Sequence, residues 1–305
     1  IETSFVDADN VEEIRNAIQE NTRAVFVESV GNPKNDVLDL AAISKIAKDF
    51  KIPFLVDNTI ATPALLNPIE YGADIVLYSL TKYIGGQGNS LGGAIVDAGN
   101  FKWDNGKFPE FTEPSAGYHG LVYHEALGEA AYIAKVRLEG LRDFGGALSP
   151  FNSFQIIQGL ETLKLRIQQH SENALELAKW LEQQEEVAWV SYPGLDSSPY
   201  KQLANKYLPN GQSGILSIGL KGGYESAKVF VDSLNVFSLL ANIGDTKSLV
   251  IHPASTTHQQ LDAESQKRSG VSPDLIRLSV GLEYIGDLKE DIKQAFALLL
   301  VNSEA

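Results

Sequence analysis

The sequence predicts an α/β fold in which helices cover a mainly parallel sheet and a smaller C-terminal α/β domain follows. Two observations support this class. Apolar, β-branched runs recur through the first 148 residues without regular polar alternation, which is typical of strands buried on both faces. Between these runs, apolar residues recur at helical spacing. Strands that alternate with helices favour a parallel sheet.

Four segments in the first part of the chain are predicted strands. Apolar residues from Leu38 to Phe50 fall at helical spacing between the first two of them. A stretch rich in Gly, Pro and aromatic residues, from about 100 to 120, is expected to be a loop. The predicted strands are Ala24–Val27, Pro53–Asp57, Ala73–Tyr78 and Gly93–Asp97.

A long helix is expected to join the two domains. Ser149 is suited to cap it and Pro150 to occupy its first position, and the helical pattern runs from Phe151 to about Gln184. We therefore divide the chain into a first domain, 1–148, and a second unit, 149–305, made of this helix and the small domain. The small domain is predicted to contain strands Ala188–Tyr192, Gly214–Gly219 and Ile276–Val280 and helices Glu225–Leu234 and Leu288–Val301.

Composition excludes several classes of function. Among 305 residues, 25 Lys and Arg face 39 Asp and Glu, which gives a net charge of −14. Such a surface repels phosphate backbones and anionic lipid, so nucleic acid and membrane are not expected partners. The absence of Cys removes disulfides and cysteine nucleophiles. With scattered His residues and no apolar run near the roughly 18 residues of a membrane span, we expect no metal site and a cytoplasmic location.

The chain contains no Met and begins with Ile1. Initiator methionine is normally trimmed only before a small residue. We therefore expect the sequence to begin inside a longer gene product.

Ligands of parallel α/β sheets bind beyond the carboxyl ends of the strands, where this sequence places Asp57 and then Ser79, Thr81 and Lys82. The two hydroxyls could face one anion, and a desolvated lysine becomes nucleophilic. An aspartate there could pair with the pyridine nitrogen of a pyridoxal cofactor. Alternatively, Lys82 is an ordinary surface lysine and Asp57 a turn former.

Arg277 begins a predicted apolar strand, an unusual position for a solvated charge. Its planar guanidinium is suited to hold an amino acid carboxylate through two parallel hydrogen bonds. The alternative is an ion pair at the interface between the domains.

At these residues the sequence resembles the Cys/Met-metabolism family of fold-type I pyridoxal-phosphate enzymes, whose fold is similar to that of aspartate aminotransferase. The matching segments run in the family order along nearly the whole chain. They are Val27–Glu28 with Gly31–Pro33, Val56–Thr59, Tyr78–Gly86, Ser248–His258 and Arg277–Gly281.

The resemblance implies that pyridoxal 5'-phosphate is the cofactor and assigns its contacts. Lys82 would bind it as a Schiff base and later move protons, while Asp57 would pair with the pyridine nitrogen. Asn32 would lie near the phenolic oxygen, and Ser79 and Thr81 would hold the phosphate. Residues 1–148 would then be the C-terminal portion of the large cofactor-binding domain.

The resemblance also implies that Arg277 takes the carboxylate of an amino acid substrate, with Ser248 beside it. Within the family, the sequence is most similar to the O-acetylhomoserine sulfhydrylase branch. That branch replaces the γ-acetoxy group of O-acetyl-L-homoserine by sulfide or a small thiol, which gives homocysteine or methionine and acetate. Cystathionine γ-synthase and γ-lyase activities remain alternatives, as does a non-catalytic remnant or binding module.

The resemblance begins partway through the family's large domain. It implies that a missing N-terminal segment or a second polypeptide completes the site. The expected assembly is a homo-oligomer, either a dimer of subunits that share active sites or a tetramer.

Overall fold

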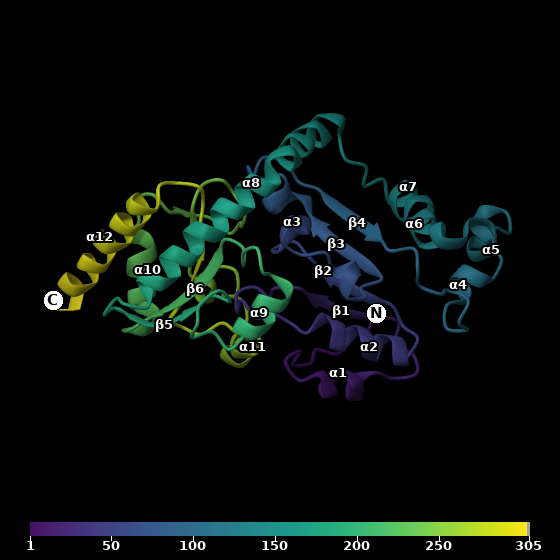
Figure 1. Ribbon diagram of the computed structural model, residues 1–305, viewed down its shortest axis with the longest axis horizontal. Helices are drawn as coiled ribbons and strands as arrows, with labels where there is room; N and C mark the ends of the chain where they lie inside the picture. The colour runs from purple at the N-terminus through teal and green to yellow at the C-terminus, as the bar shows by residue number, and fades with distance from the viewer. Residues whose placement is uncertain (304–305) are drawn as a thin grey trace.

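The computed structural model describes residues 1–303 and contains two sheets that lie side by side and are joined by one long helix (Figure 1). The first sheet has the order β1-β2-β3-β4. Its first three strands are parallel and β4 runs antiparallel to β3. The bounds are Val25–Glu28 for β1, Phe54–Asp57 for β2, Ile75–Ser79 for β3 and Gly93–Asp97 for β4. The α/β class predicted from the sequence is thus confirmed.

The register of this sheet brings polar residues together at its carboxyl edge. Glu28 pairs with Asp57, and Asp57 pairs with Leu77, so β1, β2 and β3 end close to one another. The direction of β4 follows from its connection. The connection from Ser79 to Gly93 contains only the five-residue η2 (Leu80–Ile84) and a loop, without the crossover α-helix that usually joins parallel strands.

Helices and turns on one side of the first sheet enclose its main core. The helix α2 begins after Asp39, whose side chain caps it by accepting a hydrogen bond from the Ala42 N–H. The buried strand residues Val27, Phe54 and Val56 contribute to this core. These elements are α1 (Val11–Ala17), α2 (Leu40–Asp49), α3 (Thr62–Leu65) and η1 (Pro68–Tyr71).

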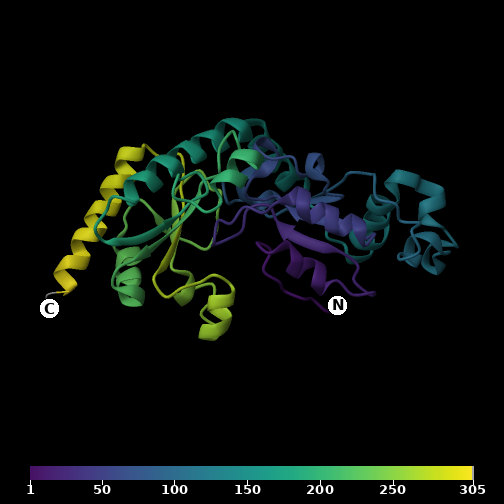
Figure 2. The same cartoon turned by 60° about the horizontal axis from the view of Figure 1, so that its bottom comes forward.

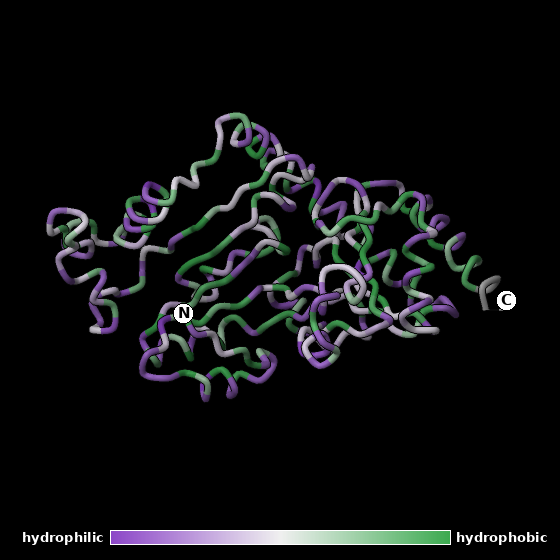
Figure 3. The backbone as a smooth tube through the Cα atoms, turned by 180° about the vertical axis from the view of Figure 1, so that it is seen from behind, coloured by the Kyte–Doolittle hydropathy of each residue, from purple (hydrophilic) through white to green (hydrophobic). Residues whose placement is uncertain are grey.

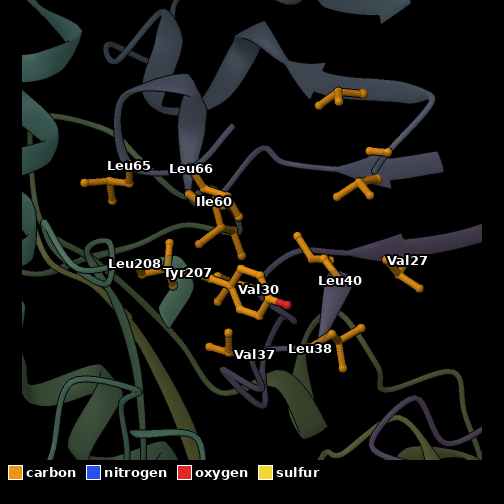
Figure 4. Close-up of a cluster of buried hydrophobic side chains, with 14 of the residues drawn as sticks. Val27, Val30, Val37, Leu38, Leu40, Ile60, Leu65, Leu66, Tyr207 and Leu208 are labelled. Atoms are coloured by element: carbon orange, nitrogen blue, oxygen red, sulfur yellow. The ribbon is translucent and has the colours of Figure 1, made fainter. Parts of the chain in front are cut away.

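The same core also receives side chains from the second half of the chain. Figure 4 shows Tyr207 and Leu208 among Val30, Val37 and their neighbours. The Tyr207 hydroxyl donates to the Asp39 carboxylate. The two halves of the molecule therefore share buried surface.

Residues 100–144, of which about 100 to 120 were expected to be a loop, contain short helices around an aromatic cluster. Trp103 stacks on Phe111 with ring centroids 4.2 Å apart, and Ile75 of β3 closes the cluster from the sheet side. Aromatic packing therefore orders this segment. The elements are α4 (Pro109–Thr112), η3 (Ala116–Tyr118), α5 (Tyr123–Leu127), η4 (Gly128–Ala130), α6 (Ala131–Lys135), η5 (Val136–Leu141) and α7 (Arg142–Phe144).

The connecting helix α8 spans Pro150–Leu181 and is 32 residues long. Its predicted cap is confirmed, because the Ser149 side chain accepts a hydrogen bond of 3.2 Å from the Asn152 N–H. Ile156 and Leu163 of its first half are buried in the first core. Leu177 and Leu181 of its second half are buried in the core of the second sheet.

The second sheet has the order β5-β6-β9-β8-β7 and is antiparallel except for the pair β7 and β8. In Figure 3 apolar segments run through the middle of this half of the molecule. The short strands β7 and β8 were not predicted. The elements are β5 (Val187–Ser191), α9 (Lys201–Tyr207), β6 (Ile215–Leu220), α10 (Gly223–Ser233), β7 (Ser238–Leu239), β8 (Leu249–Ile251), η6 (Pro253–Ser255), α11 (Ala263–Arg268), β9 (Leu275–Ser279) and α12 (Ile285–Ser303).

Within residues 1–303, none of the helices combines the length and the apolar character that crossing a membrane requires.

The helix α11 projects from the second half of the molecule toward the N-terminal segment in Figure 2. The division of the chain between residues 148 and 149 stays a prediction.

Candidate active site

The candidate lysine lies in a turn at the carboxyl end of β3. A π-helical segment, η2 (Leu80–Ile84), follows Ser79 directly. Lys82 interrupts it with φ −86° and ψ −134°. Hydrogen bonds of 2.8 Å from Gly85 N to Leu80 O and from Gly86 N to Lys82 O close the turn. The backbone therefore fixes the position from which the Lys82 side chain leaves the sheet.

The helix α8 anchors this turn through the buried Arg166. Its Nη1 donates to Tyr83 O at 2.8 Å and its Nη2 donates to Ile84 O at 3.2 Å. Among residues 1–303 the Arg166 guanidinium has no carboxylate partner within ion-pair distance. Its charge is stabilised by backbone carbonyl dipoles, and burial lowers its pKa.

A loop of the second half of the molecule, residues 240–246, packs against the same turn. Thr246 N donates to Gly86 O at 2.9 Å. Gly244 has φ +76°, and a Cβ there would lie 2.6 Å from Tyr83 N. Only glycine permits this close approach of the two backbones. The loop thereby brings Asn242 and Asp245 next to Lys82.

The Lys82 amine is half-buried and donates to Asn242 Oδ1 at 2.5 Å. Burial, and then the positive charge of Arg277, lower the pKa of this amine below its ordinary value, whereas Asp245 acts in the opposite direction. A lowered pKa increases the fraction of neutral amine, which is the nucleophilic and basic form.

Arg277 lies on β9 and faces the first sheet. Its Nη1 donates to Asn32 Oδ1 at 3.2 Å and its Nη2 donates to Asn242 O at 3.0 Å. Its side chain is buried, and its Nε has no hydrogen-bond partner in the part of the chain that the structure describes. Burial lowers its pKa to about 10. Asn32 in the first half and Asn242 in the second are both neutral amide partners, so within residues 1–303 an interface ion pair does not account for this charge.

The carboxylate of Asp57 lies at the end of β2, where its Oδ1 accepts a 2.9 Å hydrogen bond from Thr59 N. Glu28 lies beside it on β1 and lines a cleft of about 300 Å³ together with Asn32. Glu28 is exposed to solvent in this cleft, but the surrounding protein partly desolvates its carboxyl group. This desolvation, and then the charge of Asp57, raise the pKa of Glu28 to about 7. The raised pKa of Glu28 therefore depends in part on its carboxylate neighbour at the end of β2.

The two predicted phosphate-binding hydroxyls differ in their surroundings. Ser79 uses its N–H to donate to Thr59 Oγ1 at 2.8 Å, and no hydrogen bond engages its hydroxyl within the described chain. The Thr81 hydroxyl accepts from Gly92 N at 3.0 Å and donates to Gly92 O at 3.3 Å. Ser79 is therefore free to bind an anion, while Thr81 also ties the turn to β4.

Ser248, predicted to lie beside Arg277, is placed in a different environment. Its hydroxyl donates to Glu283 Oε2 at 2.9 Å and accepts from Gly281 N at 2.8 Å, and the residue is fully buried. These contacts do not support a role toward a substrate carboxylate, which stays a prediction without structural support. The structure does bring Lys82 and Arg277 together through Asn242, and Arg277 in turn contacts Asn32.

Three residues of the site were not singled out from the sequence: Asn242, Asp245 and Arg166. Their segments carried weak signals, since Asn242 and Asp245 lie in a Gly-containing stretch and Arg166 interrupts an apolar helical face. The contacts that bring Asn242 and Arg166 into the site join residues more than 80 positions apart, and Asp245 joins the site through Asn242.

Comparison with known proteins decides the family. The family model described as Cys/Met metabolism PLP-dependent enzyme matches residues 1–297. The chain belongs to this family. It is therefore a pyridoxal-phosphate-dependent enzyme, and the predicted fold type and cofactor are confirmed.

Curated relatives of this family member share about half of its residues. O-acetyl-L-homoserine sulfhydrylase of Leptospira meyeri is 51% identical over 304 residues, which cover 97% of this chain and 69% of that protein. O-acetyl-L-homoserine sulfhydrylase 1 of Thermus thermophilus is 50% identical, with 94% of this chain and 68% of that protein covered. Homocysteine/cysteine synthase of Saccharomyces cerevisiae is 50% identical, with 97% and 70% covered.

A similar solved structure is that of the putative O-acetylhomoserine (thiol)-lyase of Campylobacter jejuni. Its TM-score is 0.92 at 42% identity, and the match covers 95% of this chain and 69% of that one. That protein carries a pyridoxyl-lysine monophosphate.

The donor set around Lys82 fits pyridoxal 5'-phosphate. A half-buried amine of lowered pKa suits an aldehyde. Asp57 at the neighbouring strand end supplies a carboxylate for a protonated pyridine nitrogen. The free hydroxyl of Ser79 lies at the end of the lysine-bearing strand. These residues are the ones that would hold the cofactor in this chain.

Proposed function

We propose that the chain catalyses γ-replacement on O-acetyl-L-homoserine. Sulfide, or a small thiol, takes the place of the acetoxy group at the γ-carbon, which gives homocysteine or methionine and acetate. The observation that carries this proposal is the pairing of Lys82 with Arg277 across Asn242, in a chain about 50% identical to sulfhydrylases of this substrate.

The carboxylate of the substrate would bind the Arg277 guanidinium, whose buried Nε lacks a partner. A carboxylate accepts two parallel N–H bonds from such a fork, and it would restore the charge balance of a buried cation that has neutral neighbours. The α-amino group of the bound substrate would then point toward the lysine turn. Arg277 thus sets the orientation of the amino acid.

Lys82 would hold the cofactor, release it to the substrate amine and then act as the base. Bound pyridoxal 5'-phosphate would supply the electron sink for charge that develops at the substrate α-carbon. The Lys82 amine would remove the α-proton, give that proton up and, once neutral again, accept a β-proton, after which acetate leaves from the γ-carbon. Sulfide or the thiol would then add at the γ-carbon, and the β- and α-carbons would regain their protons. Asp57 would pair with the protonated pyridine nitrogen of the bound cofactor. The lowered pKa of Lys82 favours the neutral amine that these transfers need.

Product analysis tests this proposal. Purified protein loaded with pyridoxal 5'-phosphate is given O-acetylhomoserine with sulfide, and in parallel with cysteine or with water alone. Homocysteine and acetate from the sulfide reaction, in preference to cystathionine or 2-oxobutanoate, are the expected products. Preference for cysteine would identify a cystathionine γ-synthase, and 2-oxobutanoate without a thiol would identify a γ-lyase.

The matched control is Lys82→Ala. It should lose the visible absorbance of the bound cofactor and all three products together. A parent protein that binds the cofactor yet forms none of these products would identify a non-catalytic binding module and contradict the proposal.

We propose in addition that the working assembly is a homo-oligomer. Large apolar side chains are exposed on α7 and the first half of α8, including Phe144, Phe151 and Phe154. Contiguous exposed apolar side chains are typical of contact surfaces between chains. Light scattering on a size-exclusion column measures the mass, and a monomer at micromolar concentration would contradict this part of the proposal.

A further inference from the structure

We infer that Asp245 is a positioning residue that aims the Lys82 amine by fixing the orientation of the Asn242 amide. The inference rests on the proposed function, in which Lys82 moves protons at the substrate. Asp245 lies in the loop 240–246 and is 2% exposed. It belongs to no ion pair within residues 1–303.

The chain of contacts runs from the carboxylate to the amine. Asn242 Nδ2 donates to Asp245 Oδ2 at 3.2 Å, and Asn242 Oδ1 accepts from Lys82 Nζ at 2.5 Å. An ionised carboxylate only accepts hydrogen bonds. The amide NH2 must therefore face Asp245, which leaves the amide oxygen as the only group it can present to Lys82.

Reversal of this amide would place two N–H donors against the lysine amine. Besides Lys82 itself, Arg277 also contacts Asn242, but only at the backbone carbonyl, so Arg277 does not select an orientation of the side-chain amide. Asp245 thus decides whether Lys82 finds an acceptor at this point. The amine would then have a defined location whenever the cofactor is bound to substrate instead of lysine.

The surroundings of Asp245 are shaped to receive a carboxylate. Gly88, in the loop that follows the lysine turn, has φ +61°. A Cβ at this position would lie 2.7 Å from Asp245 Oδ1. The backbone at Gly88 therefore comes close to both carboxylate oxygens, one of which also accepts from Asn242, so both contacts hold the acid in place.

Charge supports the same assignment. Arg277 on β9 and Asp245 in the loop are the charged groups that act on the Lys82 amine, the first lowering its pKa and the second raising it. Removal of the Asp245 charge should lower the pKa of Lys82 further. This response can be measured without any turnover.

The test compares Asp245→Asn with Asp291→Asn. Asp291 is a matched control because it is also buried, at 5% exposure, and accepts hydrogen bonds from the N–H groups of Val236 and Phe237 in the second core. The first readout is the pH dependence of Lys82 acetylation by acetic anhydride in cofactor-free protein, followed by mass spectrometry. Asp245→Asn should move the midpoint to lower pH, and Asp291→Asn should leave it in place.

The second readout is the kinetics of the loaded enzyme. We expect Asp245→Asn to lower kcat about ten- to a hundred-fold, the cost of a misplaced catalytic group, with KM for O-acetylhomoserine unchanged. In an Asn242→Ala background, Asp245→Asn should have little further effect on kcat, since the residue through which it acts is gone. If Asp245 only stabilised the fold, the losses of kcat from Asp245→Asn and Asn242→Ala would instead add in the double variant.

Three outcomes would overturn the inference. They are an unchanged Lys82 midpoint in Asp245→Asn, the same changes in Asp291→Asn, and full additivity with Asn242→Ala. If no variant and no parent protein turns over O-acetylhomoserine, the proposed function fails, while the acetylation experiment still decides whether Asp245 controls the lysine.

Discussion

Arg166 should be a main determinant of stability for the lysine turn, and Arg166→Met tests this. Methionine keeps most of the length of the side chain but removes its hydrogen-bond donors. Tyr83 O and Ile84 O then lose the guanidinium bonds of 2.8 Å and 3.2 Å. A buried carbonyl without a partner costs about 1–3 kcal/mol, so two of them cost about 2–6 kcal/mol. Arg166→Met also removes the desolvation cost of burying a cation, which offsets part of this loss. The free energy of unfolding should therefore fall by an amount near the lower end of the range, about 2–3 kcal/mol.

The measurement is urea denaturation followed by circular dichroism, with the free energy of unfolding extrapolated to water. Arg15→Met is the matched control, because Arg15 is partly exposed and pairs with Asp49 at 2.9 Å. Exposed pairs contribute about 0–1 kcal/mol. A loss in Arg166→Met no larger than that in Arg15→Met would refute the view that carbonyl groups need this buried guanidinium.

Three further results are expected. Burial lowers the pKa of His170 to about 4 from 6.5, so as the pH falls the unfolded chain takes up this proton before the folded protein does. Between these two pH values the free energy of unfolding of the parent should fall by about 3 kcal/mol, a loss that His170→Gln should not show. The same pH dependence of urea denaturation in both proteins would contradict this. Ser248→Ala should lower the melting temperature and leave KM for the amino acid unchanged, since its hydroxyl contacts Glu283; a raised KM would restore its predicted role. Arg277→Lys should raise KM by ten-fold or more, about 1.4 kcal/mol, and unaltered kinetics would make Arg277 structural.

The sequence was sufficient to predict the strands that carry the cofactor site. Runs such as Phe54–Asp57 are apolar at every position except the last, because both faces are buried and only the strand end meets a ligand. The same rule pointed to Ser79 and Lys82. Parallel pairing then brings these ends together without further information.

The remaining parts of the site depend on contacts that no local pattern contains. Asn242 meets Lys82 across 160 positions of sequence, and the loop that carries it has no periodicity. Ser248 was predicted from the resemblance alone, and nothing near it in sequence indicates that Glu283 is its partner. The direction of β4 follows from a connection that contains no crossover helix, and the apolar run of the strand itself does not show this.

The helix α8 limits how the molecule can move. Ile167 is buried in the first core and Ala174 in the second, two turns apart on one continuous helix. A hinge between the two sheets would have to break this helix, so the spacing between Lys82 and Arg277 is set when the chain folds instead of when a substrate binds. Amide hydrogen exchange should accordingly show β2 and β9 opening together, as one cooperative unit that spans both sheets.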